Sequence, residues 1–382
     1  MYAGAPYYAA ESALRCGVDL VTVYTAAEAC MPIKCYSPEL MVRAVYSIEV
    51  MNSYLDEEGG IIREMEGECR RGGGGGGGGG GNDAPTTKET NGSDTRRIAM
   101  MSGRPPIGGE GGRYLPIQGG EARNDDGVEV LAEGLGRMTS LEGKLHALGE
   151  RREVFIGGIV DDITHAFPTL HAMCIGPGLG RHPLVFSVAE KVIQRAIEAR
   201  LMLIIDADAL FMLSLGEYRD LLEDLRSYER CVMTPNLMEM RRLRDALSAD
   251  DGGGRRSNII VQKGNVDEII HDSYTMRCEE EGGLKRCGGI GDVLAGTISA
   301  FMAWNAILEM EETHDAQNDV ITNKESEWQR RLFASWAAAV VVKKATKVAF
   351  QKKKRSMSAL DVIGEIGDVV NDMEDDLKNA VP

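Results

Sequence analysis

The sequence predicts an α/β fold, in which a central, mostly parallel β-sheet is flanked by helices on both faces. Short, continuous apolar runs recur from about residue 150 onward, helical stretches separate them, and a glycine-rich or polar cluster follows each run directly. Continuously apolar strands that alternate with helices are typical of a parallel sheet covered on both sides. The chain has 382 residues, 43% of them hydrophobic, which is ample for such a core.

The first 50 residues read as folded. Residues 9–16 have the spacing of apolar side chains that indicates a helix, and residues 18–24 form a short β-rich run. We therefore expect this region to belong to the same α/β core.

Residues from about 52 to 150 read as an insert. Its extreme part, about 56–125, contains an unbroken run of ten glycines at residues 72–81, followed by Asn, Asp, Thr, Ser and Pro and by Gly-Gly pairs. Such a segment buries too little apolar surface to offset its chain entropy. We predict a disordered insert or a mobile surface loop, and a tolerated expansion explains the glycine run better than a functional device.

The remaining elements follow in order after residue 150. Buried strands are expected at residues 172–175, 201–205, 231–233 and 259–261. Helices are expected at residues 184–199 and 332–350, with a further segment at 358–370. A hairpin at residues 269–277 breaks the alternation.

The four predicted strands share one feature that bears on function. A cluster of special residues follows each strand: 176–180 (GPGLG), 206–208 (DAD), 234–239 (TPNLME) and 263–267 (KGNVD). In open α/β sheets, ligands bind outside the carboxyl ends of the strands. We therefore expect the four clusters to meet at one edge of the sheet, with Asp292 as a fifth contributor.

The stretch RCGGIGDVLAGT, residues 286–297, places Asp292 between a glycine turn and an amphipathic helix. One interpretation is an N-cap, since acids are favoured at helix starts. The other is a catalytic base beside backbone N–H groups that bind a phosphate. The stretch is not a Walker loop, because no lysine precedes Thr297, and it lacks a dinucleotide fingerprint, because residue 294 is Leu.

The other clusters each have a structural alternative. Asn236 with Glu239 fits a capping box, and Lys263-Gly264 occurs at many turns. Asp206 and Asp208 follow an apolar strand, so a buried member of the pair needs a partner or a metal. A Mg²⁺ ion would be held mostly by phosphates and water. The nearby histidines lack a metal or nucleophile partner at useful spacing and are expected to be structural or surface residues: His165, His171 and His182.

Charge and cysteine usage exclude several classes of function. The formal net charge of −16 makes the protein a poor general ligand for nucleic acid or anionic membranes. No apolar run reaches the roughly 18 residues that a membrane helix needs. Eight cysteines without Cys-x-x-Cys spacing are expected to be reduced thiols. We predict a cytoplasmic protein, with the mitochondrion as the alternative should a further amino-terminal extension exist.

Taken in order, these clusters resemble one family. The segments IGPGLGR, IIDADAL, MTPNLMEMRRL, VQKGNVDEII and KRCGGIGDVLAGT are similar to those of the ATP-dependent (S)-NAD(P)H-hydrate dehydratases, which belong to the ribokinase-like superfamily. Residues 1–50 and about 155–373 carry the resemblance, which implies one ribokinase-like domain over residues 1–382, interrupted by the insert. It implies a lyase that uses ATP, with Mg²⁺, to restore NADH or NADPH from the hydrated S-epimer, releasing ADP and phosphate.

The resemblance also implies roles for individual residues. Asp292 matches the family's base at the hydrated ring. Residues that match the hydrate-binding contacts are Gly178, Gly180, Asn236, Leu237, Met238, Glu239, Met240, Arg241, Arg242 and Asp292. Residues that match the ATP contacts are Lys263, Gly264, Asn265, Val266, Asp267, Gly282, Gly283, Leu284, Lys285, Arg286, Cys287, Gly288, Gly289, Ile290 and Gly291.

The chain departs from the family pattern in three places. Members carry a glycine-bearing strand before the segment that opens this sequence, the glycine-rich insert has no counterpart, and Ala209 stands where glycine is usual. Two other functions stay open: another ribokinase-like kinase acting on a thiazole or pyrimidine alcohol, and a nucleotide-binding protein without catalysis. The family also implies a functional partnership with an NAD(P)H-hydrate epimerase; the sequence leaves a homo-oligomer and the choice between NADH and NADPH hydrates open.

Overall fold

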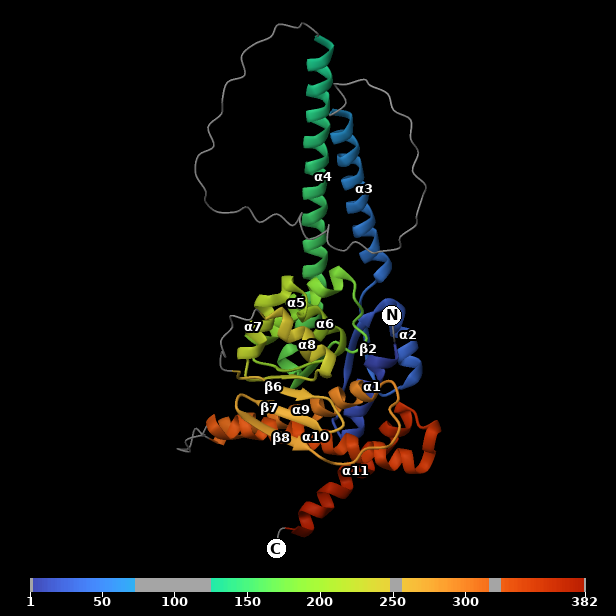
Figure 1. Cartoon of the computed structure of the whole chain (residues 1–382), viewed down its shortest axis with the longest axis vertical. Helices are drawn as coiled ribbons and strands as arrows, with labels where there is room; N and C mark the ends of the chain where they lie inside the picture. The colour runs from blue at the N-terminus through green and yellow to red at the C-terminus, as the bar shows by residue number, and fades with distance from the viewer. Residues whose placement is uncertain (1–2, 73–124, 248–255, 316–323, 381–382) are drawn as a thin grey trace. The chain divides into compact units, whose positions relative to one another are not determined.

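The computed structural model describes residues 3–72, 125–247, 256–315 and 324–380. The chain divides into two compact units, one formed by Met1–Asp56 with Leu148–Pro382 and the other by Glu57–Ala147. All strands of the described residues lie in the first unit (Figure 1).

The first unit contains a six-stranded sheet in which neighbouring strands follow one another in chain order. Its strands are β3 (Ala172–Ile175), β4 (Met202–Ile205), β5 (Cys231–Met233), β6 (Ile259–Gln262), β7 (Asp267–His271) and β8 (Tyr274–Cys278). Strands β3 to β6 are parallel, whereas β6–β7 and β7–β8 are antiparallel. The mostly parallel sheet and the hairpin that ends it are both confirmed.

Helices cover both faces of this sheet, as predicted. The helices between the parallel strands are α5 (Pro183–Glu198), α6 (Ala207–Leu213), α7 (Arg219–Ser227) and α8 (Leu237–Ala246). Those on the other side are α1 (Gly4–Cys16), α9 (Ile290–Asp315), α10 (Lys324–Lys353) and α11 (Ala359–Ala380) (Figure 1). Side chains of β4 alternate between two cores: Met202 and Ile204 pack with α9 and α10, while Leu203 and Ile205 pack with α5 and α6. This alternation follows from the period of two in a strand.

The amino-terminal elements form a second, smaller sheet rather than joining the first. Strand β1 (Thr22–Ala26) pairs in parallel with β2 (Met41–Tyr46), and α2 (Ala27–Tyr36) connects them. A cavity of about 470 Å³ separates β1 from β3, so neither strand pairs with the other. The expected strand at residues 18–24 is therefore confirmed with a shift toward the carboxyl end, but β2 was not predicted.

The ends of the predicted insert are helical, whereas a disordered insert or mobile loop was expected there. Helix α3 (Ile48–Gly72) and helix α4 (Asp125–Thr164) extend into residues 52–150 from both sides. Within the Glu57–Ala147 unit, Ile61 and Leu141 are buried, and Arg137 pairs with Glu68 at 3.8 Å. Apolar burial between two helices can therefore order these ends despite their polar composition. Most of the glycine run, and the rest of the predicted loop to residue 124, lie outside the described residues.

Helix α9 is a long apolar helix in the core that also contains Met202 and Ile204. No run long enough for a membrane helix was expected, yet by length and composition the segment Ile290–Glu311 could cross a membrane. However, 61% of its apolar 18-residue window is buried inside the protein. It packs against α1 and α10, and the Ser12 hydroxyl donates a hydrogen bond to the Val293 carbonyl at 3.1 Å. The burial and these contacts identify α9 as a core helix, and α1 holds its first turns in place.

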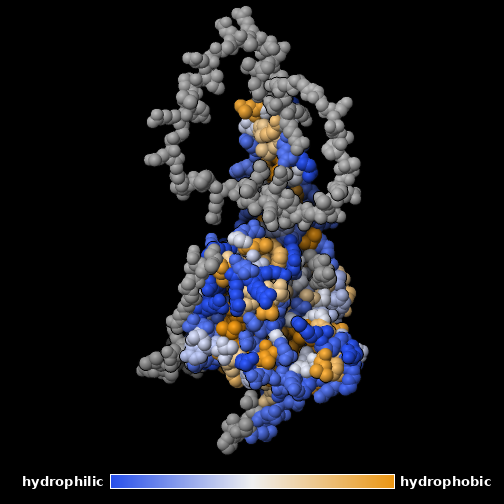
Figure 2. Space-filling model, in the orientation of Figure 1, coloured by the Kyte–Doolittle hydropathy of each residue, from blue (hydrophilic) through white to orange (hydrophobic). Residues whose placement is uncertain are grey.

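The surface is mainly hydrophilic, and the cysteines form no disulfides. Figure 2 shows a face on which hydrophilic residues predominate and hydrophobic ones are scattered. All eight cysteines are free, as predicted.

Candidate active site

The clusters after β3, β4, β5 and β6 meet at one edge of the sheet, as the sequence predicts. Backbone hydrogen bonds join them in turn: the Asp206 N–H donates to the Ile175 carbonyl at 3.0 Å, and the Thr234 N–H donates to the Ile205 carbonyl at 3.1 Å. The Lys263 N–H donates to the Pro235 carbonyl at 2.9 Å. Each cluster therefore begins where the parallel ladder ends, so the position of every cluster depends on its neighbour.

Asp206 is the buried member of the aspartate pair and has the partners that its burial requires. Its side chain is 1% exposed, and its Oδ1 accepts hydrogen bonds from Lys263 Nζ at 2.6 Å and from Thr234 Oγ1 at 2.7 Å. Asp206 stands at the N-cap of α6 but does not cap it with its side chain. The prediction that a buried acid here needs a partner is confirmed, and the partner is a lysine.

Asp292 lies in the first turn of α9 and differs electrostatically from Asp206. Burial and the negative charge of Asp206 raise the pKa of Asp292 from its ordinary 3.8 to about 6, while Lys263 opposes the rise and Asp208 adds to it. Among the described residues its carboxylate has no hydrogen bond or ion pair with another side chain. Because α9 begins at Ile290, Asp292 is inside the helix and not at its cap. The N-cap interpretation is therefore wrong.

The glycine turn before Asp292 is held by close packing. Gly289 has φ +96°, and a Cβ there would lie 2.6 Å from the ring of Tyr8, which belongs to α1. A side chain at this position would therefore be strained by its backbone and would clash with Tyr8. A Cβ at Gly291 would lie 3.4 Å from Lys263 Nζ, so the ammonium group faces the turn. The backbone N–H groups, the helix start and this lysine together favour an anion.

The GPGLG turn after β3 is fixed against the next strand. Gly176, Gly178 and Gly180 all have positive φ, and a Cβ at Gly176 would lie only 1.7 Å from the Asp206 carbonyl oxygen. The Gly180 N–H donates to Asp208 Oδ2 at 3.0 Å. The turn also borders the cavity between β1 and β3. It therefore approaches a neighbouring backbone closely, as the glycines predict.

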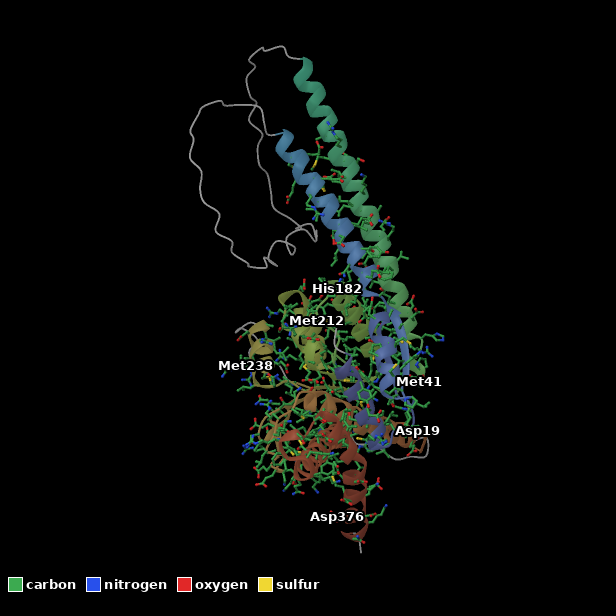
Figure 3. All side chains as sticks on the ribbon, turned by 90° about the vertical axis from the view of Figure 1, so that its right-hand side faces the viewer. Asp19, Met41, His182, Met212, Met238 and Asp376 are labelled. Atoms are coloured by element: carbon green, nitrogen blue, oxygen red, sulfur yellow. The ribbon has the colours of Figure 1, made fainter. Side chains whose placement is uncertain are left out.

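The start of α8 contains the capping box that the sequence predicts. The Asn236 side chain accepts hydrogen bonds from the Met238 and Glu239 N–H groups, and the Glu239 side chain accepts one from the Asn236 N–H. Helical periodicity places the predicted hydrate-binding residues of α8 on two faces, one buried and one exposed. Met240 is 3% exposed and faces inward. The side chains that are exposed are Leu237, Met238, Arg241 and Arg242 (Met238 is labelled in Figure 3).

The loop after β6 is held by Asp267 and by Lys343 of α10. The Asp267 carboxylate accepts a hydrogen bond from the Gly264 N–H at 2.7 Å and pairs with Lys343 Nζ at 3.4 Å. Lys343 also donates to the Gly264 and Asn265 carbonyls. Asp267 therefore shapes the loop, while Asn265 is exposed and Val266 is partly buried.

Some residues of the segment between β8 and α9 contact the rest of the protein, and others are exposed to solvent. The Gly283 N–H donates to Thr346 Oγ1 at 3.2 Å, and Gly282 also lies against α10. Lys285 Nζ donates to the Met357 carbonyl at 2.6 Å, so its ammonium group anchors the segment. Leu284 is 91% exposed, Arg286 is exposed and Cys287 is half-buried.

Sequence reasoning missed three residues that contribute to this geometry. Thr234 is fully buried and donates to Asp206. Arg181 pairs with Asp208 at 3.3 Å and lies 3.9 Å from the centre of the Phe211 ring. Tyr8 packs on the glycine turn. Thr234 could have been suspected, because a hydroxyl next to a buried strand needs a partner; the contacts of Tyr8 and Arg181 are long-range.

A metal site made of protein groups is absent from the parts of the chain that the structure describes. No group of three or more His, Cys, Asp or Glu side chains there could hold an ion. His182 caps α5 by accepting from the Leu184 N–H at 3.2 Å, which confirms a structural role for this histidine.

Comparisons with known proteins identify the family of the chain. A family model described as NAD(P)H-hydrate dehydratase matches residues 1–58 and 144–366. The ATP-dependent (S)-NAD(P)H-hydrate dehydratase of Entamoeba histolytica is 33% identical over 211 residues, 53% of this chain and 63% of that protein. The enzyme of the same name from Dictyostelium discoideum is 31% identical over 225 residues, 56% of this chain and 70% of that protein. The chain thus spans less than two thirds of the length of the Entamoeba relative.

A solved structure supports the fold alone. A hypothetical protein from Streptococcus mutans is 16% identical and aligns with a TM-score of 0.50, covering 97% of this chain and 87% of its own. The family match includes the clusters after β3 to β6 and the stretch containing Asp292. The chain belongs to the NAD(P)H-hydrate dehydratase family.

Proposed function

We propose that this protein is an ATP-dependent dehydratase that restores NADH or NADPH from its hydrated S-epimer. The observation that carries the proposal is the position of Asp292, whose partly buried carboxylate follows a glycine turn that favours an anion and lies near enough to Lys263 for the two charges to interact. The relatives named above are dehydratases that depend on ATP, and the family match includes this turn.

The proposed reaction has two stages. Asp292 accepts the proton of the hydrate's hydroxyl group as that oxygen forms a bond to the γ-phosphorus of ATP, and the bond to the leaving oxygen of ADP breaks. Phosphate is a far better leaving group than hydroxide. The lone pair of the ring nitrogen then expels phosphate, and loss of a proton from the neighbouring ring carbon restores the double bond.

The pKa of Asp292 suits the first stage. A carboxyl group with a pKa of about 6 is mostly ionised at neutral pH, yet it is a stronger base than an ordinary aspartate. The turn at Gly288–Gly291 and Lys263 would face the negative charge of the transferred phosphoryl group.

The remaining predicted contacts are distributed around this centre. We propose that the exposed side chains at the start of α8, together with Gly178 and Gly180, bind the hydrate, and that residues 263–267 and 282–291 bind ATP. Mg²⁺ would arrive with ATP and be held mainly by its phosphates, which fits the lack of a protein-made metal cluster among the described residues. We also propose that the unit containing β3 to β8 is the catalytic domain and that residues between α3 and α4 are an insert in it.

The specificity for one epimer has a consequence for partners. An enzyme that accepts only the S-epimer leaves the R-epimer untouched. We therefore propose that an NAD(P)H-hydrate epimerase converts the R-epimer into the S-epimer in the cell. The proposed reaction makes no assumption about the compartment or the oligomeric state of the protein.

One assay tests the function and separates it from the alternatives. Purified protein is mixed with hydrated NADH, with and without ATP, and the absorbance of the restored dihydronicotinamide is followed while ADP is measured. We expect absorbance to recover only with ATP, with one ADP formed per NADH. A stable phosphorylated product would indicate an alcohol kinase instead, and ATP binding without turnover would indicate a nucleotide-binding protein.

A further inference from the structure

The carboxylate of Asp206 is the most buried charge at the strand ends, and the reaction above gives it no task. It joins the ends of three neighbouring strands, because Asp206 follows β4, Thr234 follows β5 and Lys263 follows β6. Its Oδ1 accepts from both partners, at 2.7 Å from Thr234 and 2.6 Å from Lys263. A buried carboxylate is tolerated only when it is paired in this way, so the pair fixes the lysine as well as the acid.

Lys263 has a second side that faces away from Asp206. Its side chain is 18% exposed, and its Nζ lies 3.4 Å from the position of a Cβ on Gly291. An ammonium group has three N–H donors, and Asp206 accepts one of them. The other donors are directed by this geometry toward the glycine turn and the start of α9, where an anion is favoured.

We propose that Asp206 is a positioning residue, which holds the Lys263 ammonium group against the Gly288–Gly291 turn so that it contacts the phosphates of ATP. The proposal rests on the proposed function, since it assigns a task within the same site. Asp206 itself touches neither ATP nor the hydrate; it acts through Lys263.

The same pair sets the charge around Asp292. The titratable groups that interact with the Asp292 carboxylate are Asp206, Asp208, Lys263 and Cys174. Removing the negative charge of Asp206 would lower the pKa of Asp292, and removing the positive charge of Lys263 would raise it. Because the base must be ionised, the acid limb of the pH–rate profile moves in the same direction as this pKa.

A purely structural role for Asp206 makes a different prediction. Loss of a strand-to-strand link would lower the free energy of unfolding. It would leave the ATP affinity of the folded fraction unchanged, although loss of the Asp206 charge would still move the acid limb. ATP affinity therefore separates the two roles, and the pH profile tests only the charge that the pair places around Asp292.

The experiment compares Asp206→Asn, Lys263→Met, the double variant and the control Asp224→Asn, which removes one negative charge from an exposed position on α7. ATP binding is titrated calorimetrically without hydrate, after circular dichroism has shown that each variant is folded. We expect Lys263→Met to weaken ATP binding about tenfold or more and Asp206→Asn to weaken it severalfold. The double variant should be no weaker than Lys263→Met alone, and the control should bind as the wild type does.

The acid limb of kcat/KM gives a second, independent readout. It should move to lower pH in Asp206→Asn and to higher pH in Lys263→Met. Wild-type ATP affinity in Asp206→Asn would overturn the proposal, as would additive losses of ATP affinity in the double variant. Should Asp206→Asn not fold, Asp206→Glu replaces it, because it keeps the charge but displaces the carboxylate that holds Lys263. Weakened ATP binding in Asp206→Glu supports the proposal, and wild-type ATP affinity there overturns it. A wild-type protein that binds ATP but restores no NADH would refute the proposed function, while the binding titrations would still test Asp206.

Discussion

Two clusters of buried charge in the first unit differ in how their charges are balanced. On α9 and α10, Glu309 pairs with Arg331 at 2.8 Å and also with Arg230, and Arg331 is 2% exposed. At the strand ends, Asp206 shares Lys263 with the neighbouring Asp292, which has no partner of its own among the described side chains. The first cluster has cations for its acid, whereas the second has an excess of acid.

The difference indicates what each cluster is for. A buried acid with well-placed cations stays ionised and links its elements. A partly buried acid without a partner, such as Asp292, has a raised pKa and can exchange a proton near neutral pH, which a structural link does not require. The unbalanced charge at Asp292 therefore lowers the stability of the fold, as is expected where function requires a catalytic base.

The largest effect on stability should come from the balanced cluster. Glu309→Gln leaves Arg230 without this counter-charge and Arg331 with only the longer ion pair to Glu327 at 3.7 Å, so we expect the free energy of unfolding to fall by about 3 kcal/mol. Urea denaturation at pH 7.5 measures it. A fall well below 1 kcal/mol would show that the cluster is not the link described, whereas the acid limb of kcat/KM should stay in place.

The unbalanced cluster should respond in the opposite direction. Burial of the Asp292 charge is unfavourable because the pKa is raised from 3.8 to about 6, so the stability that this group contributes below pH 3.8 is lost as the pH rises through 6. Asp292→Asn removes that loss but also a favourable acid in the first turn of α9. We expect a gain of about 1–2 kcal/mol at pH 7.5 and none at pH 4, by urea denaturation at both pH values. A loss at pH 7.5 would contradict the electrostatic account.

The smallest effect is expected for an exposed ion pair near the same edge. Arg181→Met removes the ion pair with Asp208 and the contact with the Phe211 ring, and the arginine side chain is 59% exposed. Solvent screens such a pair, so the loss should be under about 1 kcal/mol. Thermal unfolding alongside Arg219→Met, another exposed pair, checks this; a loss like that of Glu309→Gln would place Arg181 in a buried network.

The sequence was sufficient where local pattern decides the structure. Strands β3 and β5 begin and end as predicted, and the capping box at Asn236 is present, because periodicity and caps act within a few residues. The separate β1–β2 sheet and the helical ends of the insert were not predicted, since each depends on contacts between distant segments. The cap role proposed for Asp292 failed because α9 begins two residues earlier, at Ile290, next to a turn that packs against Tyr8 of α1.

The sequence predicted which residues lie near one another in the candidate site, but not which atoms they contact. Placing polar clusters at strand ends brings Asp206, Lys263 and Asp292 into one region, and the structure confirms that region. The sequence could not show that Lys263 pairs with Asp206, that Asp267 and Lys285 bind the protein's own backbone, or that Met240 faces inward. Those distinctions depend on which way each side chain points once the elements have packed.

The central claim is that Asp292 is the base of an ATP-dependent dehydration. The most direct test is the pH profile of kcat/KM for the restoration of NADH, measured for the wild type and Asp292→Asn with ATP binding verified for both. The account predicts a wild-type acid limb near pH 6, and a variant that binds ATP but is slower by about 10²–10⁴-fold and lacks that limb. A variant that keeps both the wild-type rate and the limb would contradict it.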